Sequence, residues 1–493
     1  MPVPDRSTVY RLSNGSRLIQ DDDGMLIINT GKGSWARLSS EAGRYCSDAL
    51  GVSVGTVCDR LAAEHGSEAV SDMLNTFERL REMKLLEEYV QPAGIREAVM
   101  GRIREKCCDD YGDDEIQADH GDGSVDPQCA GQGIRPFRPK KIHFVVSESC
   151  NLRCRTCYRD FCHEEADKWH ARSSAEWVAT IKPAEVVVTG GEPTLREDLL
   201  DLISIVSVPG TRVVLATNGT RIDRRLAKRL AKLGCDVQVS IESPDPERHD
   251  SIRGLGSHAA AVKGVQNLVS AGVPNVELVP TVGLLNTYDT EAIWEFSSSL
   301  GVKCHISLFQ PVGAGAASPI KVDSGHRFAF SMVEYMEACW RRAGAPEIVG
   351  LDEVGFVVPR DRCGAGSAVL AVSASRLVYP CHLLMDSHLP LTIDKAKRLL
   401  EEQGVFSPWP LPDVDLMPQC RRCTVRYFCG GGCRAAALST SGRINCPDPR
   451  CNGYRVFFQS ILWSWDDECS AEENFAKAKD RIRCDLEPSL YYL

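Results

Sequence analysis

Residues 140 to 310 alternate short apolar runs with helical stretches, and this alternation constrains the fold more than any other feature of the chain. The runs are rich in Val and Ile and are too short for buried helices. Strands that alternate with helices form parallel sheets, because each helix carries the chain back to where the next strand begins. The predicted strands are Ile142–Ser147, Glu185–Thr189, Arg212–Thr217, Asp236–Ile241, Val276–Val282 and Lys303–Phe309. We therefore predict an α/β fold, with the sheet curled into a partial (β/α)6 barrel of the TIM type.

The bulk composition excludes several classes of protein. A chain of 493 residues is too long for one compact core, so roughly two to four domains are expected. The formal net charge of −10 argues against nucleic acid as a partner, because phosphate binding needs clustered Lys and Arg. The first residues lack the apolar core of a signal peptide, and no apolar run reaches the roughly 18 residues that span a membrane. We expect a cytoplasmic protein without a membrane partner.

The region before the barrel reads as a small domain and a connector. Three strand-like pieces, Val9–Leu12, Arg17–Gln20 and Met25–Asn29, precede three helical stretches, which predicts a winged-helix shape without the basic stripe of a DNA-binding domain. From Cys107 to Ile134 there is no Lys or Arg, so this stretch is expected to be a partly disordered linker. The predicted divisions are 1–88 for the small domain, 89–139 for the linker, 140–315 for the barrel, 316–355 for a bridging region and 356–493 for a cysteine-rich domain. This last domain should depend on bound metal rather than on a large core.

The chain contains 22 cysteines, and their grouping is informative. Without an export signal the expected compartment is reducing, where grouped cysteines usually bind metal or do redox chemistry. Cys150, Cys154 and Cys157 follow the first predicted strand directly. Three thiolates on one loop can hold three irons of a [4Fe–4S] cube and leave the fourth iron open to a small molecule. A zinc or disulfide loop is the alternative on spacing alone.

Polar clusters also follow the next three predicted strands, where an α/β barrel places its chemistry. Gly190, Gly191 and Glu192 come after the second strand; the glycines allow close backbone approach, and the carboxylate suits an ammonium group. Asn218 follows the third strand. The fourth leads through a Ser-Ile-Glu-Ser segment at 240–243 to Arg253. These side chains should therefore face the same mouth as the cysteines.

The order of CxxxCxxC, Gly-Gly-Glu-Pro, Thr-Asn-Gly and Ser-Ile-Glu-Ser across residues 142–310 resembles the radical S-adenosylmethionine (SAM) superfamily. By this resemblance Cys150, Cys154 and Cys157 bind the cluster. The expected SAM contacts are Gly190, Gly191 and Glu192 at the methionine amino end, Ser240 at the ribose, Arg253 at the carboxylate, and Asn218 in the same wall. The resemblance implies that an electron, from a donor such as ferredoxin or flavodoxin, releases a 5′-deoxyadenosyl radical that abstracts a hydrogen atom. Thr156 departs from the family, which has a large apolar or aromatic residue there.

A second group of cysteines lies near the end of the chain. Cys420, Cys423, Cys429 and Cys433 alone would suit a zinc ribbon. With the flanking cysteines, however, the spacing resembles the SPASM extension, which carries auxiliary iron–sulfur clusters, generally [4Fe–4S], in peptide-modifying members of the superfamily. That resemblance assigns Cys363, Cys381 and Cys433 to the nearer auxiliary cluster, and Cys420, Cys423, Cys429 and Cys451 to the farther one. The nearer cluster lacks an obvious fourth ligand, for which Cys446 or a non-cysteine residue is a candidate, and Arg376 replaces a glycine of the family.

Residues 1–88 resemble the leader-peptide recognition element, the fold of the small chaperone in pyrroloquinoline quinone biosynthesis. The matching stretches are 24–29, 38–42 and 80–86. Such units bind a leader as an added strand, and the strand edge at Met25–Thr30, with the third helix, is the expected groove. Together these features predict an enzyme that modifies a ribosomally made precursor peptide and forms a thioether or carbon–carbon crosslink. The alternatives are a sulfatase-maturing enzyme that makes formylglycine and a non-catalytic zinc-ribbon protein that binds peptides. The sequence assigns no catalytic acid or base: His249, Asp250, Tyr158 and Glu242 lie near the predicted mouth, and each suits a structural role as well as a catalytic one.

Overall fold

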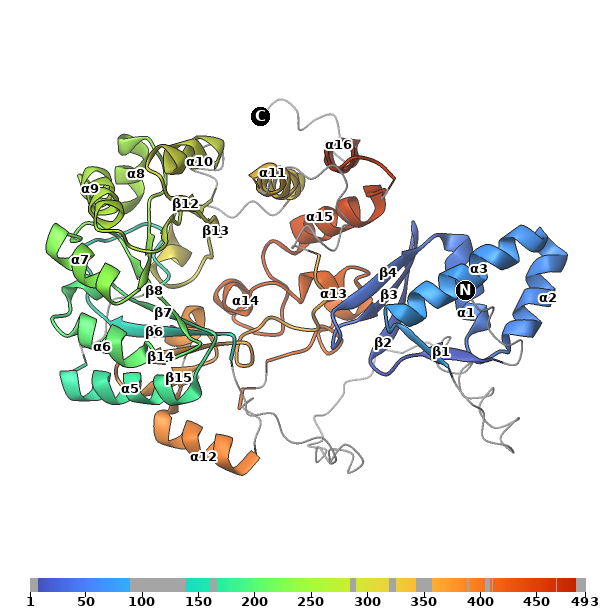
Figure 1. The fold of residues 1–493 in the computed structure, drawn as a ribbon, viewed down its shortest axis with the longest axis horizontal. Helices are drawn as coiled ribbons and strands as arrows, with labels where there is room; N and C mark the ends of the chain where they lie inside the picture. Colours follow the sequence, from blue (N-terminus) through green and yellow to red (C-terminus); the bar gives the residue numbers. More distant parts are fainter. Residues whose placement is uncertain are drawn as a thin grey trace. The chain divides into compact units, whose positions relative to one another are not determined.

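The computed structural model describes residues 8–88, 139–159, 166–283, 290–318, 325–342, 357–387, 390–403, 408–409, 411–466 and 468–484. The chain divides into two compact units, Met1–Ile134 and Arg135–Leu493 (Figure 1). The predicted linker at 89–139 lies outside the described residues except for Pro139, and the predicted bridging region at 316–355 is described only in part. Each unit is therefore considered separately.

The first unit contains short strands followed by three helices. Its elements are β1 (Tyr10–Leu12), β2 (Ser16–Asp21), β3 (Gly24–Asn29), β4 (Ser34–Leu38), α1 (Ser40–Ala49), α2 (Val54–His65), α3 (Ser67–Glu82) and β5 (Leu86–Glu88). Serine side chains begin two of the helices: Ser39 accepts a hydrogen bond from the amide of Ala42, and Ser53 from that of Thr56. Tyr10, Phe77 and Leu80 meet in the apolar core, where the Tyr10 and Phe77 rings make an edge contact.

The strand predicted to offer a free edge is instead the centre of its sheet. β3 pairs with β2 on one side and with β4 on the other, and all six of its residues are buried. The predicted edge at Met25–Thr30 is therefore wrong. An apolar run marks a buried strand, but it cannot distinguish a central strand from an edge while its partner β4 goes unrecognised. The free edges of this three-stranded sheet belong to β2 and β4.

The second unit is built on a nine-stranded sheet in the order β12-β10-β9-β8-β7-β6-β14-β15-β16. The first six of these strands are parallel and alternate with helices along the chain, which confirms the predicted α/β fold. They are β6 (Lys141–Ser147), β7 (Glu185–Gly190), β8 (Arg212–Thr217), β9 (Asp236–Val239), β10 (Val276–Leu278) and β12 (Lys303–Cys304). The last two predicted strands are interrupted. Pro280, which has no amide proton, separates β10 from β11 (Thr281–Val282), and β11 pairs with β13 (Ser307–Leu308) in a separate ribbon.

Helices cover one face of the parallel strands (Figure 1). They are α5 (Lys168–Ile181), α6 (Leu199–Val206), α7 (Arg224–Lys232), α8 (Pro246–Arg253), α9 (Ser257–Ser270) and α10 (Thr290–Ser299). Alternate residues of the strands, such as Phe144, Val188 and Leu215, pack with these helices in one core. The intervening residues point to the other face, which carries His143 and Gln238 beside small apolar residues.

The C-terminal region completes this sheet. β14 (Val369–Ser373) pairs in parallel with β6, and β15 (Leu377–Tyr379) and β16 (Leu391–Thr392) add antiparallel strands beyond it. Leu370, Val372 and Ile393 are fully buried in the same core as β6. The expectation that the chain beyond 355 has no share in a large core is therefore wrong. The short, scattered apolar runs at 369–393 gave no sign of pairing with a strand so distant in the sequence.

The remaining helices belong to the C-terminal half of the second unit. They are α11 (His326–Arg342), α12 (Ile393–Gln403), α13 (Arg426–Cys429), α14 (Arg434–Ser441), α15 (Cys451–Ser464) and α16 (Ala471–Cys484). Helices α11, α15 and α16 pack together, and Phe475 makes ring contacts with Trp340 and Trp465 there. Among the described residues, no helix combines the length and apolar character needed to cross a membrane.

Candidate metal centre

The loop after β6 brings the first three cysteines together. Cys150, Cys154 and Cys157 are half-buried, and the amide of Leu152 donates to Cys150 Sγ (3.4 Å). Burial, with the neighbouring Cys154 and Cys150 thiolates, raises the pKa of Cys157 to about 11. Burial also raises the pKa of Cys150, and the charge of Cys154 adds to that effect. Three thiolates that repel one another in a partly buried loop are stabilised by a bound cation, which is the condition for metal ligation.

The two glycines after β7 form a close contact with this cysteine loop. A side chain at Gly190 would place its Cβ 2.4 Å from the carbonyl oxygen of Ser147, and one at Gly191 would place it 2.3 Å from that of Ser149. The backbone at Gly190 also has a φ of +154°, which disfavours other residues. The amides of Gly191 and Glu192 donate to the same two serine carbonyls (2.7 and 2.8 Å). These glycines therefore fix the loop against the next strand.

Glu192 is completely buried and joins two strand ends. Its carboxylate accepts hydrogen bonds from the Thr194 hydroxyl (2.6 Å), the Thr217 hydroxyl (2.7 Å) and the backbone N–H of Asn218 (2.8 Å). The Asn218 side chain in turn donates to Asn151 Oδ1 (2.9 Å) inside the cysteine loop. The structure thus places Glu192 and Asn218 beside the cysteines, as predicted, and reveals a bracing role that spacing alone did not suggest.

The remaining predicted SAM contacts lie on the next strand and helix. Ser240 is half-buried at the end of β9, and its amide donates to the Thr217 carbonyl (3.0 Å). Arg253 donates to the buried Glu242 carboxylate (2.6 Å), and its guanidinium lies 3.9 Å from Cys154 Sγ. Burial lowers the pKa of Arg253, but the charges of Glu242 and Cys154 outweigh it and raise the pKa overall. Arg253 is therefore a fixed cation beside the cysteine loop.

Two of the other polar residues near this mouth are structural. His249 is completely buried, and its Nδ1 accepts a hydrogen bond from the Glu242 amide (3.1 Å). Burial, followed by the charge of Arg253, lowers the pKa of His249 to about 3, so the ring is neutral at physiological pH. Asp250 accepts from the amides of Gly256 (2.6 Å) and His258 (2.9 Å) and shapes the turn before α9. His249 therefore supports the backbone of Glu242, and Asp250 orders the start of α9.

Three of the C-terminal cysteines form a set of their own. Burial raises the pKa of Cys381 to about 12, and the charges of Cys433 and Cys363 add to this effect. Cys433 begins α14, and Cys363 also raises its pKa. Cys446, the alternative ligand, is not among the principal influences on either thiol. The fold therefore groups Cys363, Cys381 and Cys433, the three residues assigned to the nearer auxiliary cluster.

The other four cysteines line one pocket. Its wall contains Cys420, Cys423, Cys429 and Cys451. Burial raises the pKa of Cys429 to about 12, and the charges of Cys451, Cys423 and Cys420 contribute. Within the described part of the chain, no three Cys, His, Asp or Glu side chains are close enough to hold a single metal ion, whereas a [4Fe–4S] cluster bonds each thiolate to a different iron and does not require that closeness.

An apolar cluster connects the first cysteine loop with the nearer auxiliary set. Tyr158, which follows Cys157, packs with Cys381 and Cys433 against Val312 and Leu384. The His382 ring makes an edge contact with Tyr158 (5.1 Å between centroids). These aromatic residues lie between two candidate clusters, and only the position of Tyr158 beside a cysteine could have indicated this.

A buried ion pair that the motifs did not indicate connects the cysteine sets to the β11–β13 ribbon. Asp448 and Arg450 are 3% and 1% exposed, and Asp448 accepts from the Cys433 amide (2.7 Å) and from Arg450 Nη2 (3.1 Å). Asp448 also lines the pocket of the other four cysteines. Arg450 extends to Gln310 Oε1 (2.5 Å), just beyond β13. One carboxylate therefore borders both sets and is linked through Arg450 to the segment after the β11–β13 ribbon.

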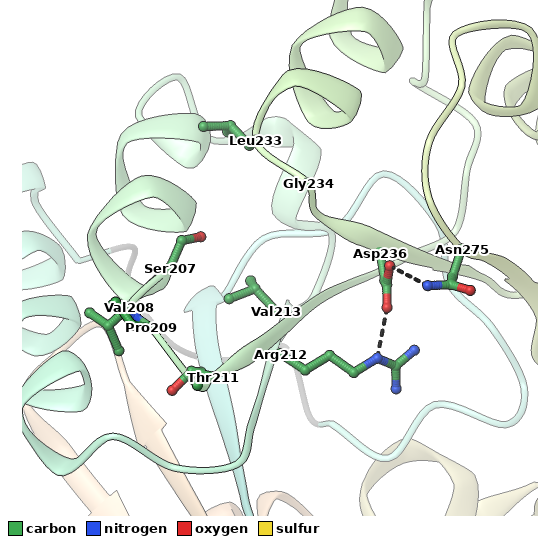
Figure 2. A pocket seen from close by; sticks show the side chains of 11 residues that line it. Ser207, Val208, Pro209, Thr211, Arg212, Val213, Leu233, Gly234, Asp236 and Asn275 are labelled. Atoms are coloured by element: carbon green, nitrogen blue, oxygen red, sulfur yellow. Dashed lines mark hydrogen bonds and ion pairs between the residues drawn. The ribbon is translucent and has the colours of Figure 1, made fainter.

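A different pocket lies at the amino ends of β8 and β9 (Figure 2). There Arg212 donates to Asp236 (2.7 Å) and Glu185 (2.8 Å), and Asn275 donates to Asp236 (2.9 Å). These charged groups pair with one another at the end of the sheet remote from the cysteine loop. Their arrangement is that of a stabilising layer.

Residues 144–296 match the radical SAM superfamily. This part of the chain is a radical SAM domain. Such a domain implies S-adenosylmethionine and a [4Fe–4S] cluster, and three half-buried thiols on one loop beside an arginine cation fit those cofactors. The match contains Cys150, Cys154, Cys157 and all six predicted SAM contacts, whose individual roles stay predictions.

The chain is also similar to curated proteins over a longer stretch. Mycofactocin maturase MftC of Mycobacterium ulcerans (strain Agy99) is 27% identical over 332 residues, which cover 64% of this chain and 89% of that protein. The AdoMet-dependent heme synthase of Methanosarcina barkeri (strain Fusaro / DSM 804) is 25% identical over 338 residues, which cover 64% of this chain and 96% of that protein. Two relatives that each match 64% of this chain are therefore named for different reactions.

Two solved structures have a similar fold. Streptococcus suis SuiB bound to S-adenosylmethionine gives a TM-score of 0.50 at 13% identity, covering 89% of this chain and 98% of that one. The enzyme anSMEcpe, with bound AdoMet and the Cp18Cys peptide, gives a TM-score of 0.53 at 18% identity, covering 69% of this chain and 99% of that one. At these identities the likeness extends to the fold alone.

Proposed function

We propose that the protein is a radical SAM maturase that crosslinks side chains of a ribosomally made precursor peptide. The observation that carries this proposal is the division of the seven C-terminal cysteines into two sets, one bordering the radical SAM loop and one in its own pocket. A single radical SAM cluster does not require them. The name of the maturase MftC and the peptide bound by anSMEcpe support the same reading.

We propose that the sheet curves into the partial barrel expected from the sequence, with the first cluster held by Cys150, Cys154 and Cys157 at its mouth. When bound, the cluster and SAM supply a 5′-deoxyadenosyl radical that removes a hydrogen atom from the substrate. The glycines after β7 fix the loop, and Arg253 balances the thiolate charge beside Cys154. Glu192, buried among donors, holds adjoining strand ends in register so that the substrate carbon can be positioned.

We propose that Cys363, Cys381 and Cys433 hold the nearer auxiliary cluster with one iron open, and that the other four cysteines hold the farther one. An open iron near Tyr158 can bind a substrate thiolate, which suits a thioether product. Closing a crosslink releases one proton and one electron from the substrate, and the auxiliary clusters provide a place for that electron. The farther set, with four ligands, is complete without substrate.

We propose that the domain at residues 1–88 captures the leader of the precursor. Strand addition needs unpaired backbone groups, and in this sheet those lie on the free edges of β2 and β4. Deletion of residues 1–88 should abolish modification of a peptide that retains its leader. SAM cleavage in the absence of peptide should remain. Unchanged crosslinking after deletion would contradict leader capture.

The direct test is anaerobic reconstitution followed by incubation with SAM, dithionite and the precursor peptide. The expected outcome is a brown protein with absorbance near ~400 nm, release of 5′-deoxyadenosine, and a peptide lighter by two hydrogen atoms per crosslink. A formylglycine product would support the sulfatase-maturing alternative instead. A colourless protein containing zinc would support the zinc-ribbon alternative. The heme-synthase relatives make a tetrapyrrole substrate the second candidate, and turnover of a tetrapyrrole but of no peptide would favour it.

A further inference from the structure

Helix α7 presents a concentrated positive surface on a chain whose formal net charge is −10. It contains no acidic residue after its capping Asp223. Exposed basic side chains continue onto the loop before it and onto α9. Helix α9 lies beside α7 (Figure 1). This basic surface consists of Arg221, Arg224, Arg225, Lys228, Arg229, Lys232 and Lys263, all of them exposed. Among the described residues, none of the seven forms an ion pair with a carboxylate.

The folding of α7 does not need this charge. Arg224 and Lys228, and likewise Arg225 and Arg229, are four residues apart on one helix, where like charges repel. Arg224 and Arg225 also lie in the first turn, where the helix dipole disfavours cations. The buried residues Ala227 and Leu230 attach the helix to the core by themselves. A self-repelling stripe that the fold does not require points to an acidic partner.

The basic surface adjoins the loop that carries the first cysteines. Asn151, beside Cys150, donates to the Thr220 hydroxyl (3.0 Å), and Thr220 directly precedes Arg221. On the α9 side, Asn267 donates to the Ile222 carbonyl (2.8 Å) and ties that helix to the same segment. The cationic surface therefore begins at the outer side of the candidate cluster loop.

Two further exposed residues extend this surface. Arg155 lies within the cysteine loop, and Leu255, at the turn between α8 and α9, is 99% exposed. The amide of Arg155 donates to the carbonyl of Ile252 (2.9 Å), which connects the loop to the end of α8. An exposed apolar side chain close in sequence to the contact with this cationic loop is suited to a small, transient contact with an acidic protein.

We propose that this surface docks an acidic one-electron carrier protein of the flavodoxin class, which reduces the cluster held by Cys150, Cys154 and Cys157. The proposal rests on the proposed function. In the transfer, the fully reduced flavin of the donor loses one electron and the oxidised cluster gains it, with no bond made or broken. Opposite charges steer the encounter, whereas the negative remainder of this chain repels an acidic donor elsewhere.

The test uses the reconstituted full-length enzyme and a flavodoxin reduced by NADPH and flavodoxin reductase. The surface variant Arg224→Glu/Arg225→Glu/Lys228→Glu is compared with Lys395→Glu/Lys397→Glu/Arg398→Glu on α12, where the same charge change falls on exposed residues of another helix. We expect SAM cleavage driven by flavodoxin to fall at least ~10-fold in the α7 variant at low salt, and to change little in the α12 variant. Affinity for oxidised flavodoxin, measured by calorimetry, should fall in parallel and should fall in the wild type as salt is added.

Dithionite separates docking from the chemistry behind it. Both variants and the wild type should cleave SAM equally with dithionite, because that reductant needs no protein contact. Equal losses in the two variants with flavodoxin, or an equal loss with dithionite in the α7 variant, would overturn the proposal. So would unchanged flavodoxin binding together with lost binding of an acidic precursor peptide. An unsubstituted enzyme that cleaves no SAM even with dithionite would instead refute the proposed function.

Discussion

The two groups of cysteines in this chain are assembled in different ways. The first three lie on one loop after β6 and are brought together by the local backbone, whereas the seven in the C-terminal region come from segments spread between 363 and 451. Two glycines and a hydrogen-bonded carboxylate brace the first loop. The second group depends on a buried ion pair and on strand pairing with the main sheet. A site on one loop withstands changes elsewhere, while a site assembled by the fold depends on distant residues.

The largest effect should come from the loop itself. Cys154→Ala should remove the first cluster and lower SAM cleavage by more than about 100-fold, since losing only a ligand's supporting contacts costs roughly 10–100-fold. Iron content and 5′-deoxyadenosine release are the measurements. Cys235→Ala, a substitution of a fully buried core cysteine remote from the thiol sets, is the control and should keep both. Normal cleavage by Cys154→Ala would show that the loop is not the site of the cluster.

The grouping of the other seven cysteines can be tested by combining substitutions. Cys420→Ala and Cys429→Ala should each remove the same cluster, the farther one. The double variant should therefore lose no more iron than either single variant. Cys420→Ala with Cys381→Ala should lose twice as much, because these thiols belong to different sets. Iron analysis and electron paramagnetic resonance of the reduced protein would distinguish these cases. Additive loss in the first pair would break the assignment.

The buried ion pair should matter more to stability than an exposed one. Asp448→Asn leaves Arg450 buried without a countercharge, and breaking such a pair costs about 3–5 kcal/mol. The expected result is a lower free energy of unfolding and weaker assembly of the C-terminal clusters. Asp394→Asn, which breaks the exposed pair with Arg376, is the matched control and should cost about 1 kcal/mol or less. Equal losses of unfolding free energy in the two variants would show that the buried Asp448–Arg450 pair contributes no more to stability than an exposed pair.

Mild acid should destabilise the regions around the buried histidines: burial lowers the pKa of His249 behind the first loop, and likewise the pKa of His143 and of His382 beside Cys381. In the folded state His249 has a pKa of about 3, well below its unfolded value, so the unfolded state takes up more protons. Its contribution to stability is complete above about pH 6.5 and is lost as the pH falls toward 3. Between pH 7 and pH 5 the unfolding free energy should fall by up to about 2 kcal/mol from this residue. Denaturation of His249→Gln should show a shallower pH dependence. Residues 411–484 contain no histidine, so no comparable loss is expected there.

Sequence patterns predicted the parts of the molecule that depend on neighbouring residues. The β-branched runs located the six parallel strands, because a strand buried on its helix-covered face needs such residues whatever its partner. The cysteine loop was predicted from spacing, because its three thiols lie within eight consecutive residues and need no distant partner. The bracing by Glu192 was missed, since a buried carboxylate and a ligand-binding one look alike in sequence.

Features set by distant contacts escaped prediction. The pairing of β14 with β6 and the contact of Arg450 with Gln310 both join segments far apart in the sequence, and neither has a local signature. Arg376 is instructive because it replaces a glycine of the family yet keeps a left-handed backbone with a φ of +65°. Its guanidinium pairs with Asp394 (2.9 Å), which offsets part of the conformational cost. The sequence departs from the family here, but the turn keeps the conformation that a glycine would favour.

The pairing of β14 with β6 has a consequence for biogenesis. β6 carries the radical SAM loop, yet one of its two neighbours is made only after more than 200 further residues have left the ribosome. At typical rates of synthesis this delay is on the order of ten to fifty seconds, during which β6 is an uncovered edge. A chaperone or an iron–sulfur carrier that acts on the nascent chain would meet the cysteine loop before its supporting sheet is complete. A cluster delivered during translation would therefore reach the loop in the interval before β14 pairs with β6.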